Sequence, residues 1–138
     1  MLMSKKIIIY TDGGARGNPG PAGVGVVFFE GHQTHEPFKK FKEYIGEATN
    51  NQAEYKAVVL ALEEAKKIKA EELEFYLDSE LVVNQLNMVY KIKDKDLGAL
   101  FIKIWNLRPY FKKITFRHIS REQNKLADRL VNEAIDTA

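Results

Sequence analysis

The chain has 138 residues, a formal net charge of +2 and a hydrophobic content of 45%. This length fits one compact domain, so we expect a single domain over residues 1–138. No apolar run approaches the roughly 18 residues that a transmembrane helix needs, so we expect no membrane partner. The apolar run that follows the first six residues is too short for the core of a secretory signal peptide.

The sequence contains no cysteine. This excludes a disulfide scaffold, an iron–sulfur cluster, a thiol nucleophile and a cysteine-ligated zinc site. The three histidines are too scattered to predict an all-histidine zinc site. We expect a cytoplasmic protein, and we expect it to be a monomer.

Charge is unevenly distributed along the chain. Residues 91–129 hold eleven Lys or Arg against four Asp or Glu, and the rest of the chain holds ten against fifteen. A basic half can hold a polyanion, and an acidic remainder can hold cations. Helices of mixed charge with solvated faces are the simpler explanation of the same pattern.

The first third of the chain predicts short antiparallel strands. β-branched and aromatic residues indicate strands over residues 7–12, 24–29 and 38–45. A segment rich in glycine and proline, residues 13–21, predicts a turn region between the first two strands. The short connections favour hairpins.

The remainder alternates between helices and strands. Apolar spacing predicts helices over residues 51–69, 79–88, 97–107 and 122–135, and strands over residues 73–77 and 114–119. Trp105 falls at core spacing with Phe101 and Ile104, which favours packing over base stacking. Strands joined by helices should run parallel, so we predict an α/β fold. Its mixed five-stranded sheet is flanked by helices, and its last two strands run parallel to the first.

Two acidic residues end predicted strands. Asp12 ends the first strand and precedes two glycines, and Asp78 ends the fourth and precedes Ser79 at a helix start. If these strands are parallel neighbours, their carboxyl ends meet where open α/β sheets bind ligands. Two acids at that place repel each other unless a divalent cation lies between them.

Two more acids lie at the borders of apolar helix faces, Glu54 near one helix start and Asp128 in the last helix. From such a border a carboxylate can reach into a cleft while its helix packs on the sheet. For Glu54, the alternative is an acid that offsets the helix macrodipole. For Asp128, the alternative is a surface charge paired with Lys125 or Arg129.

Oxygen ligands without histidine or cysteine suit a hard cation, so Mg²⁺ or Mn²⁺ is the natural choice. Two such ions about 3.5–4 Å apart could activate a water and stabilise the leaving oxygen of a phosphodiester. The acidic cluster would then hold metal while the basic half holds a phosphate backbone.

Four segments resemble the motifs of type 1 ribonuclease H: YTDGGARGNPGPAG (10–23), TNNQAE (49–54), LDSE (77–80) and NKLADRL (124–130). They occur in the family's order and span nearly the whole chain. The resemblance implies the ribonuclease H fold and endonucleolytic cleavage of the RNA strand of RNA–DNA hybrids. The implied products carry 5′-phosphate and 3′-hydroxyl ends, and duplex RNA is a second candidate substrate.

The resemblance also assigns roles to residues. Two Mg²⁺ ions, with Mn²⁺ as a substitute, would be held by Asp12, Glu54, Asp78 and Asp128. The hybrid would be contacted by Gly13, Gly14, Asn18, Asn50, Asn51, Ser79 and Glu80. Glycines let the backbone approach a ribose 2′-hydroxyl, and asparagine side chains both donate and accept hydrogen bonds. Turn formation by the glycines and helix capping by the asparagines are competing explanations.

The sequence departs from the family's pattern before the last motif. Many members carry a catalytic histidine in that loop, and here His118 or Arg121 could take its place. His118 belongs to the predicted strand over residues 114–119, so we favour Arg121. Its role would be electrostatic, because an arginine is not a general base at working pH. The short loop resembles the archaeal-like branch of the family.

The second departure is the short segment over residues 90–96, where several relatives insert a basic handle. We therefore expect the substrate to be gripped by some of Lys91, Lys93, Lys95, Lys112, Lys113 and Arg117. The alternative function is a non-catalytic module of the same fold that binds hybrids or duplex RNA, although the four acids argue against it. A phosphate-cradling nucleotide-binding domain ranks low because no Gly-Lys-Ser/Thr sequence is present.

Overall fold

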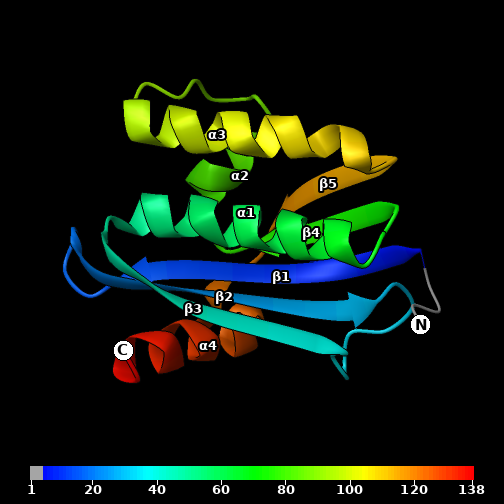
Figure 1. Ribbon diagram of the computed structural model, residues 1–138, viewed down its shortest axis with the longest axis horizontal. Helices are drawn as coiled ribbons and strands as arrows, with labels where there is room; N and C mark the ends of the chain where they lie inside the picture. The colour runs from blue at the N-terminus through cyan, green and yellow to red at the C-terminus, as the bar shows by residue number, and fades with distance from the viewer. Residues whose placement is uncertain (1–4) are drawn as a thin grey trace.

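The computed structural model describes residues 5–138, so the first four residues of the segment weighed as a signal peptide lie outside the described residues. The described chain forms a five-stranded sheet with the order β3-β2-β1-β4-β5 (Figure 1). Its strands are β1 (Lys6–Ala15), β2 (Gly20–Glu30), β3 (Lys39–Ala48), β4 (Glu72–Leu77) and β5 (Lys113–His118). β1, β2 and β3 pair antiparallel, β4 is parallel to β1, and β5 is parallel to β4. The predicted mixed sheet is confirmed.

Helices enclose the sheet from both sides (Figure 1). They are α1 (Asn50–Lys67), α2 (Glu80–Leu86), α3 (Lys95–Leu107) and α4 (Lys125–Asp136). α1 packs on β1 and β2, and α3 packs on α1, whereas α4 covers the opposite face of β1, β2 and β3. Polar side chains of α1 on one face of the sheet and of α4 on the other can therefore reach the carboxyl end of β1.

The main core lies between the sheet and α1. Ile7, Ile9 and Phe75 point to this side at the two-residue period of a strand, and they pack with Tyr55 and Leu62 of α1. These five side chains are fully buried. A smaller cluster on the other face joins β1 and β2 to α4. Burial on both faces explains why β1 and β2 are apolar over nearly their whole length.

The glycine-rich segment forms more strand and less turn than predicted. Gly14 pairs with Gly23 across β1 and β2, which confines the turn to residues 16–19. A Cβ atom on Gly25 would lie 2.4 Å from the carbonyl oxygen of Ala127 in α4. The absence of a side chain at Gly25, within β2, therefore lets α4 pack closely against the sheet.

Two sequence-based expectations about the later helices are wrong. The helix predicted over residues 122–135 begins as a 3₁₀-helix (Arg121–Asn124), so α4 starts only at Lys125 and Asp128 lies in its first turn. Trp105 is 49% exposed and stacks on Phe101. The buried side of α3 runs through Leu97 and Ile104, and one residue further along turns a side chain by about 100°.

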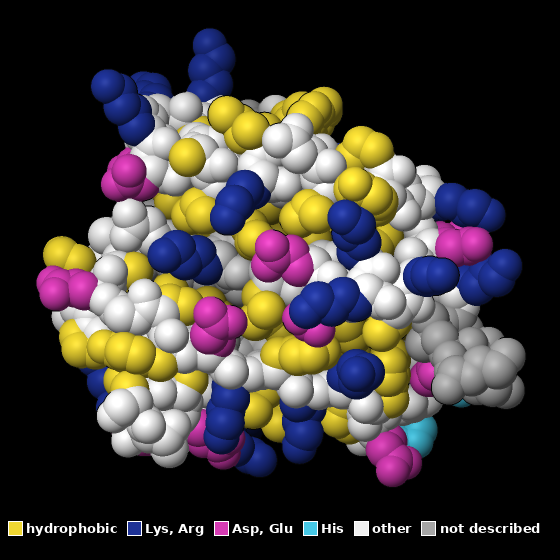
Figure 2. Space-filling view, in the orientation of Figure 1, with side chains coloured by type: hydrophobic (Ala, Val, Ile, Leu, Met, Phe, Trp, Pro, Cys, Tyr) yellow, Lys and Arg dark blue, Asp and Glu magenta, His cyan; other side chains and the backbone are white. Residues whose placement is uncertain are grey.

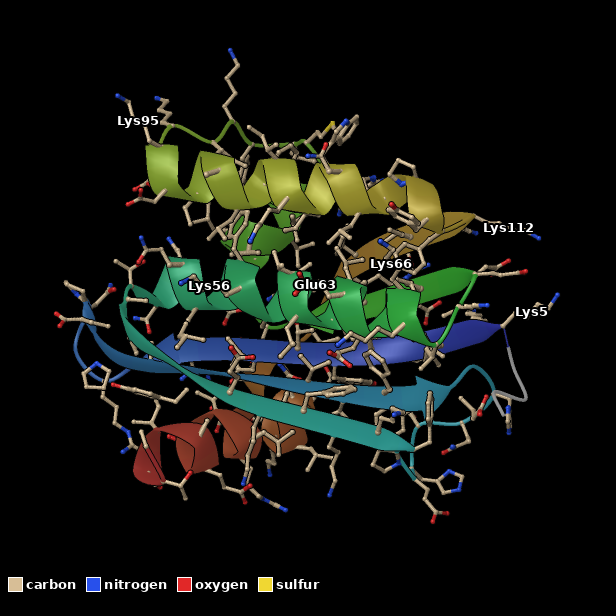
Figure 3. The ribbon with its side chains drawn as sticks, in the orientation of Figure 1. Lys5, Lys56, Glu63, Lys66, Lys95 and Lys112 are labelled. Carbon is tan, nitrogen blue, oxygen red and sulfur yellow. The ribbon has the colours of Figure 1, made fainter. Side chains whose placement is uncertain are left out.

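The surface over α1 and α3 mixes both charge signs (Figure 2). Lys95 and Lys112, both candidates for gripping a polyanion, lie at opposite ends of this face (Figure 3). Lys112 forms an ion pair of 3.2 Å with Glu71. Two of the six candidate cations therefore lie too far apart to act on one short stretch of a polyanion. Within residues 5–138, no helix has the length and apolarity needed to cross a membrane.

Candidate active site

Three carboxylates from separate elements meet at the carboxyl end of β1. Asp12 lies on β1, Asp78 follows the adjacent parallel strand β4, and Glu54 enters from the second turn of α1. One oxygen of each carboxylate lies within 4.8 Å of the other two. The parallel pairing of β1 with β4 thus brings Asp12 close to Asp78, which lies 66 positions later in the sequence.

Asp128 approaches this group from the first turn of α4. It repels and hydrogen-bonds Asp12, although it lies outside the tight group of three. All four predicted carboxylates line one cavity of about 520 Å³. Within residues 5–138, no ion pair joins Asp128 to Lys125 or Arg129, so the surface pairing weighed as an alternative is not observed.

Burial and mutual repulsion perturb two of these acids. Burial, with repulsion from Asp78, raises the pKa of Asp12 to about 7. Burial, followed by repulsion from Asp12, raises the pKa of Glu54 well above its usual value, while the backbone N–H of Gly13 donates to this carboxylate and opposes the rise. The Oε2 atom of Glu54 is buried and has no hydrogen-bond partner in the described chain. An all-oxygen group that repels itself and leaves a buried acceptor free fits a hard divalent cation.

These pKa shifts predict that the metal-free protein loses stability as pH rises. The folded state of Asp12 binds its proton more tightly than the unfolded state, whose pKa is near 3.8. Between about pH 4 and pH 7 the folded state therefore holds the extra proton, and unfolding becomes easier as that proton leaves. A shift of this size corresponds to about 4 kcal/mol at most.

Thermal unfolding followed by circular dichroism at pH 5, 6, 7 and 8 in EDTA measures this effect. We expect the melting temperature to fall from pH 5 to pH 8, and a saturating divalent cation to reduce the fall. A melting temperature that rises steadily over this range in EDTA would contradict the raised pKa of Asp12.

Gly13 is required by packing. A Cβ atom there would lie 2.2 Å from the backbone carbonyl carbon of Ala53 in the first turn of α1. A Cβ atom on Gly14 would meet nothing closer than 3.7 Å, at Val131. The missing side chain of Gly13 lets α1 start against β1, and this contact carries Glu54 to Asp12. Gly14 lines the cavity, as Gly13 does.

The asparagines join the β1–β2 turn to α1. The Oδ1 atom of Asn50 accepts a hydrogen bond from the backbone N–H of Ala15 at 2.8 Å, and the backbone N–H of Asn50 donates to Oδ1 of Asn18 at 3.0 Å. The side-chain cap of α1 is Thr49, so capping by Asn50 or Asn51 is not observed. Asn50 and Asn51 line the cavity, whereas Asn18 does not.

Of the remaining predicted site residues, which lie near the start of α2 and near the 3₁₀-helix, only some line the cavity. Ser79 caps α2 by accepting a hydrogen bond from the backbone N–H of Val82 at 3.3 Å, and it also lines the cavity. Glu80 is exposed and lies outside the cavity lining. Arg121 lines the cavity, but His118, the last residue of β5, is exposed and does not. The structure thus places the arginine, and not the histidine, beside the carboxylates.

Sequence reasoning missed Arg16 and Asn132, which also line the cavity. The guanidinium of Arg16 pairs with Asp136 at 2.6 Å and donates to Oδ1 of Asn132 at 3.3 Å. These contacts tie the β1–β2 turn to the C-terminal helix. Arg16 lies within the motif over residues 10–23, but only the tertiary structure shows that α4 returns beside it.

The strand order and the carboxylate cavity define the chain as a ribonuclease H-like protein. A family model described as "Reverse transcriptase-like" matches residues 10–134. A bifunctional protein of Mycobacterium tuberculosis is 42% identical over 134 residues, which cover 96% of this chain and 36% of that protein. The chain thus spans about a third of the length of this curated relative.

Two solved structures are similar over almost their full length. Ribonuclease H1 of the halophilic archaeon Halobacterium salinarum has a TM-score of 0.92 and 39% identity, with coverage of 96% of this chain and 99% of that one. The LC11 ribonuclease H1 in complex with an RNA/DNA hybrid has a TM-score of 0.89 and 47% identity, with coverage of 95% and 97%. The chain therefore belongs to the reverse transcriptase-like family of ribonuclease H proteins, which confirms the resemblance.

Proposed function

We propose that this protein is a metal-dependent endonuclease that cleaves the RNA strand of RNA–DNA hybrids to 5′-phosphate and 3′-hydroxyl ends. The convergence of three carboxylates within 4.8 Å, in a cavity that the fourth also lines, is the observation that carries this proposal. A module that only bound nucleic acid would gain nothing from repelling acids beside phosphates. The hybrid complex of the LC11 ribonuclease H1 supports the choice of substrate.

Asp12, Glu54, Asp78 and Asp128 would hold two divalent ions, and we propose Mg²⁺ with Mn²⁺ as a substitute. When bound, these ions supply Lewis-acid activation of a water and stabilise the leaving ribose oxygen. The chain's own acids set the spacing of this centre, and their rigid attachment to β1, β4 and α1 holds it in place. Asn50, Asn51, Gly14 and Ser79 line the same cavity, and we propose that they contact the hybrid.

The end of the molecule that holds the carboxylates also offers cations for the phosphate backbone. Gln52, in the first turn of α1, donates to Asp96, in the first turn of α3, at 3.3 Å, which joins the two helix starts. Lys95 lies at this end of the molecule (Figure 3). We propose that Lys95, with its sequence neighbours Lys91 and Lys93, grips the hybrid, and that Lys112, at the far end, does not.

A direct test compares three labelled substrates of one sequence: an RNA–DNA hybrid, duplex RNA and duplex DNA. We expect the RNA strand of the hybrid to be cut in Mg²⁺ or Mn²⁺, to give 5′-phosphate ends, and to remain intact in EDTA. Duplex DNA should remain intact throughout, and the duplex RNA arm decides whether it is a second substrate. Hybrid binding without cleavage in either metal would favour the non-catalytic module. The single domain, the monomer and the cytoplasmic location stay predictions.

The alanine variants of Arg121 and His118 are expected to differ in kcat. Arg121 lines the cavity, so Arg121→Ala should lower kcat by about tenfold, less than the loss of a buried donor, because water and salt screen an exposed cation. His118→Ala should stay within about twofold of the wild type, since a side chain outside the site has only indirect effects. Steady-state hybrid cleavage measures both, and the reverse ranking would transfer the role to His118.

A further inference from the structure

Asn124 is a buried polar residue at the start of α4 that the proposed chemistry does not use. Only 1% of its surface is exposed. Its Nδ2 atom donates to the backbone carbonyl of Thr11 at 2.9 Å and to Oδ2 of Asp78 at 3.0 Å. The two N–H groups of the amide therefore donate to two other parts of the chain, one to β1 and one to the residue that follows β4.

The partners of this amide all adjoin the carboxylate group. Thr11 directly precedes Asp12, Asp78 is one of the three clustered acids, and Asp128 lies one helical turn beyond Asn124. One side chain thus connects three of the elements that carry the proposed ligands. Asn124 itself does not line the cavity, so it contacts the carboxylate group only through its hydrogen bond to Asp78.

The orientation of the amide follows from its partners. Both partners are acceptors, a carbonyl and a carboxylate, so only the NH₂ group can face them. The Oδ1 atom of Asn124 is left buried with no hydrogen-bond partner in the described chain. A buried unsatisfied acceptor costs stability, whereas an apolar side chain of the same shape would avoid that cost. The gain from Asn124 must therefore lie in its two donors.

Asp78 needs such a donor because its neighbours push it away. Asp12 and Asp78 repel each other, and Asp78 is less buried than Asp12. An unrestrained carboxylate would rotate toward water. A hydrogen bond to Oδ2 fixes this rotation and therefore determines where Oδ1 points.

We propose that Asn124 is a positioning residue that holds the Asp78 carboxylate in its metal-binding orientation, an inference that rests on the proposed metal-dependent function. Residues that orient a metal ligand typically contribute about 10–100-fold to metal affinity or activity. Asn124 makes no contact with the cavity, so its loss affects the metal requirement and kcat while the KM for the hybrid is unchanged.

The test measures Mn²⁺ binding by isothermal titration calorimetry, with no substrate present, alongside hybrid cleavage. Asn124→Ala should raise the Mn²⁺ concentration for half-saturation by about tenfold or more. Asn124→Leu fills the same space but has no donor, so it should show the same loss of Mn²⁺ affinity as the alanine variant. Recovery of wild-type affinity in the leucine variant would assign the loss to packing and overturn the inference. Circular dichroism confirms that each variant is folded, and unfolding of both would make Asn124 a purely structural residue and overturn the inference.

Asn87→Ala is the control for the loss of an amide-to-carbonyl hydrogen bond, at an exposed position. The Nδ2 atom of Asn87 also donates to a strand carbonyl, that of Phe116 at 3.1 Å, but within residues 5–138 it donates to no carboxylate. This variant should lose some stability and keep the Mn²⁺ affinity and kcat of the wild type. An equal loss of Mn²⁺ affinity in the Asn87 and Asn124 variants would show that lost stability, and not carboxylate orientation, is responsible.

A double-mutant cycle separates an action through Asp78 from a general effect. In an Asp78→Asn background, Asn124→Ala should change the Mn²⁺ affinity by less than about twofold, because residues that act as a unit are not additive. A full tenfold loss in that background would overturn the inference. If the wild type binds Mn²⁺ but cuts no hybrid, the proposed function fails while the effect of Asn124 on binding is still measured.

Discussion

Asp12→Asn is expected to lower metal-dependent hybrid cleavage by at least about 10³-fold, because charge stabilisation by bound metal is worth several kcal/mol and 1.36 kcal/mol is tenfold in rate. Asp12 is the acid that touches every other member of the group: Asp78 and Asp128 repel it, and Glu54 hydrogen-bonds it. The amide keeps the size of the side chain, so the loss should come from charge. Single-turnover cleavage at saturating Mg²⁺ measures it.

The same variant should be more thermally stable than the wild type at pH 8 in EDTA, since it removes a buried charge from a repelling group. Loss of activity together with gained stability excludes misfolding as the cause. Glu63→Gln, on the exposed side of α1 (Figure 3), removes the same charge away from the carboxylates and should change neither property. Near-normal turnover of the Asp12 variant would refute the proposed metal centre.

Gly13→Ala is expected to lower the free energy of unfolding by about 3 kcal/mol or more, at or above the upper end of the usual cost of overpacking. The added methyl group would lie 2.2 Å from backbone atoms of Ala53, which cannot move unless the start of α1 moves. That movement would also carry Glu54 away from Asp12. Urea unfolding measures the stability loss.

Gly14→Ala is the adjacent control. Its Cβ atom would make only ordinary contact, 3.7 Å from Val131, and its backbone does not require a left-handed conformation. We expect its free energy of unfolding to stay within about 1 kcal/mol of the wild type, as Gly-to-Ala changes do at compatible positions. Equal destabilisation by the two variants would show that helix approach at Gly13 is not the reason for the glycine.

Local patterns determined most of the elements. Alternating and continuous apolar runs predicted all five strands of the described sheet, and three- and four-residue spacing predicted α1 to within two residues at each end. These signals are readable because burial imposes the period of each element on its own sequence. The errors lie where a distant element decides the outcome, as at Trp105, whose side chain lies beside the face of α3 that packs on α1.

The sequence by itself identified the four carboxylates, because their residue types and strand or helix borders are local properties. It also separated Arg121 from His118, since strand membership is local too. Only the tertiary structure showed which residues support the carboxylates without lining the cavity, and which glycine the packing of a helix requires. The amide of Asn124 reaches Thr11 across 113 positions, and Gly13 is required by a helix that begins 37 residues later. Such contacts depend on how separate elements pack, and no local period of apolar residues records that packing.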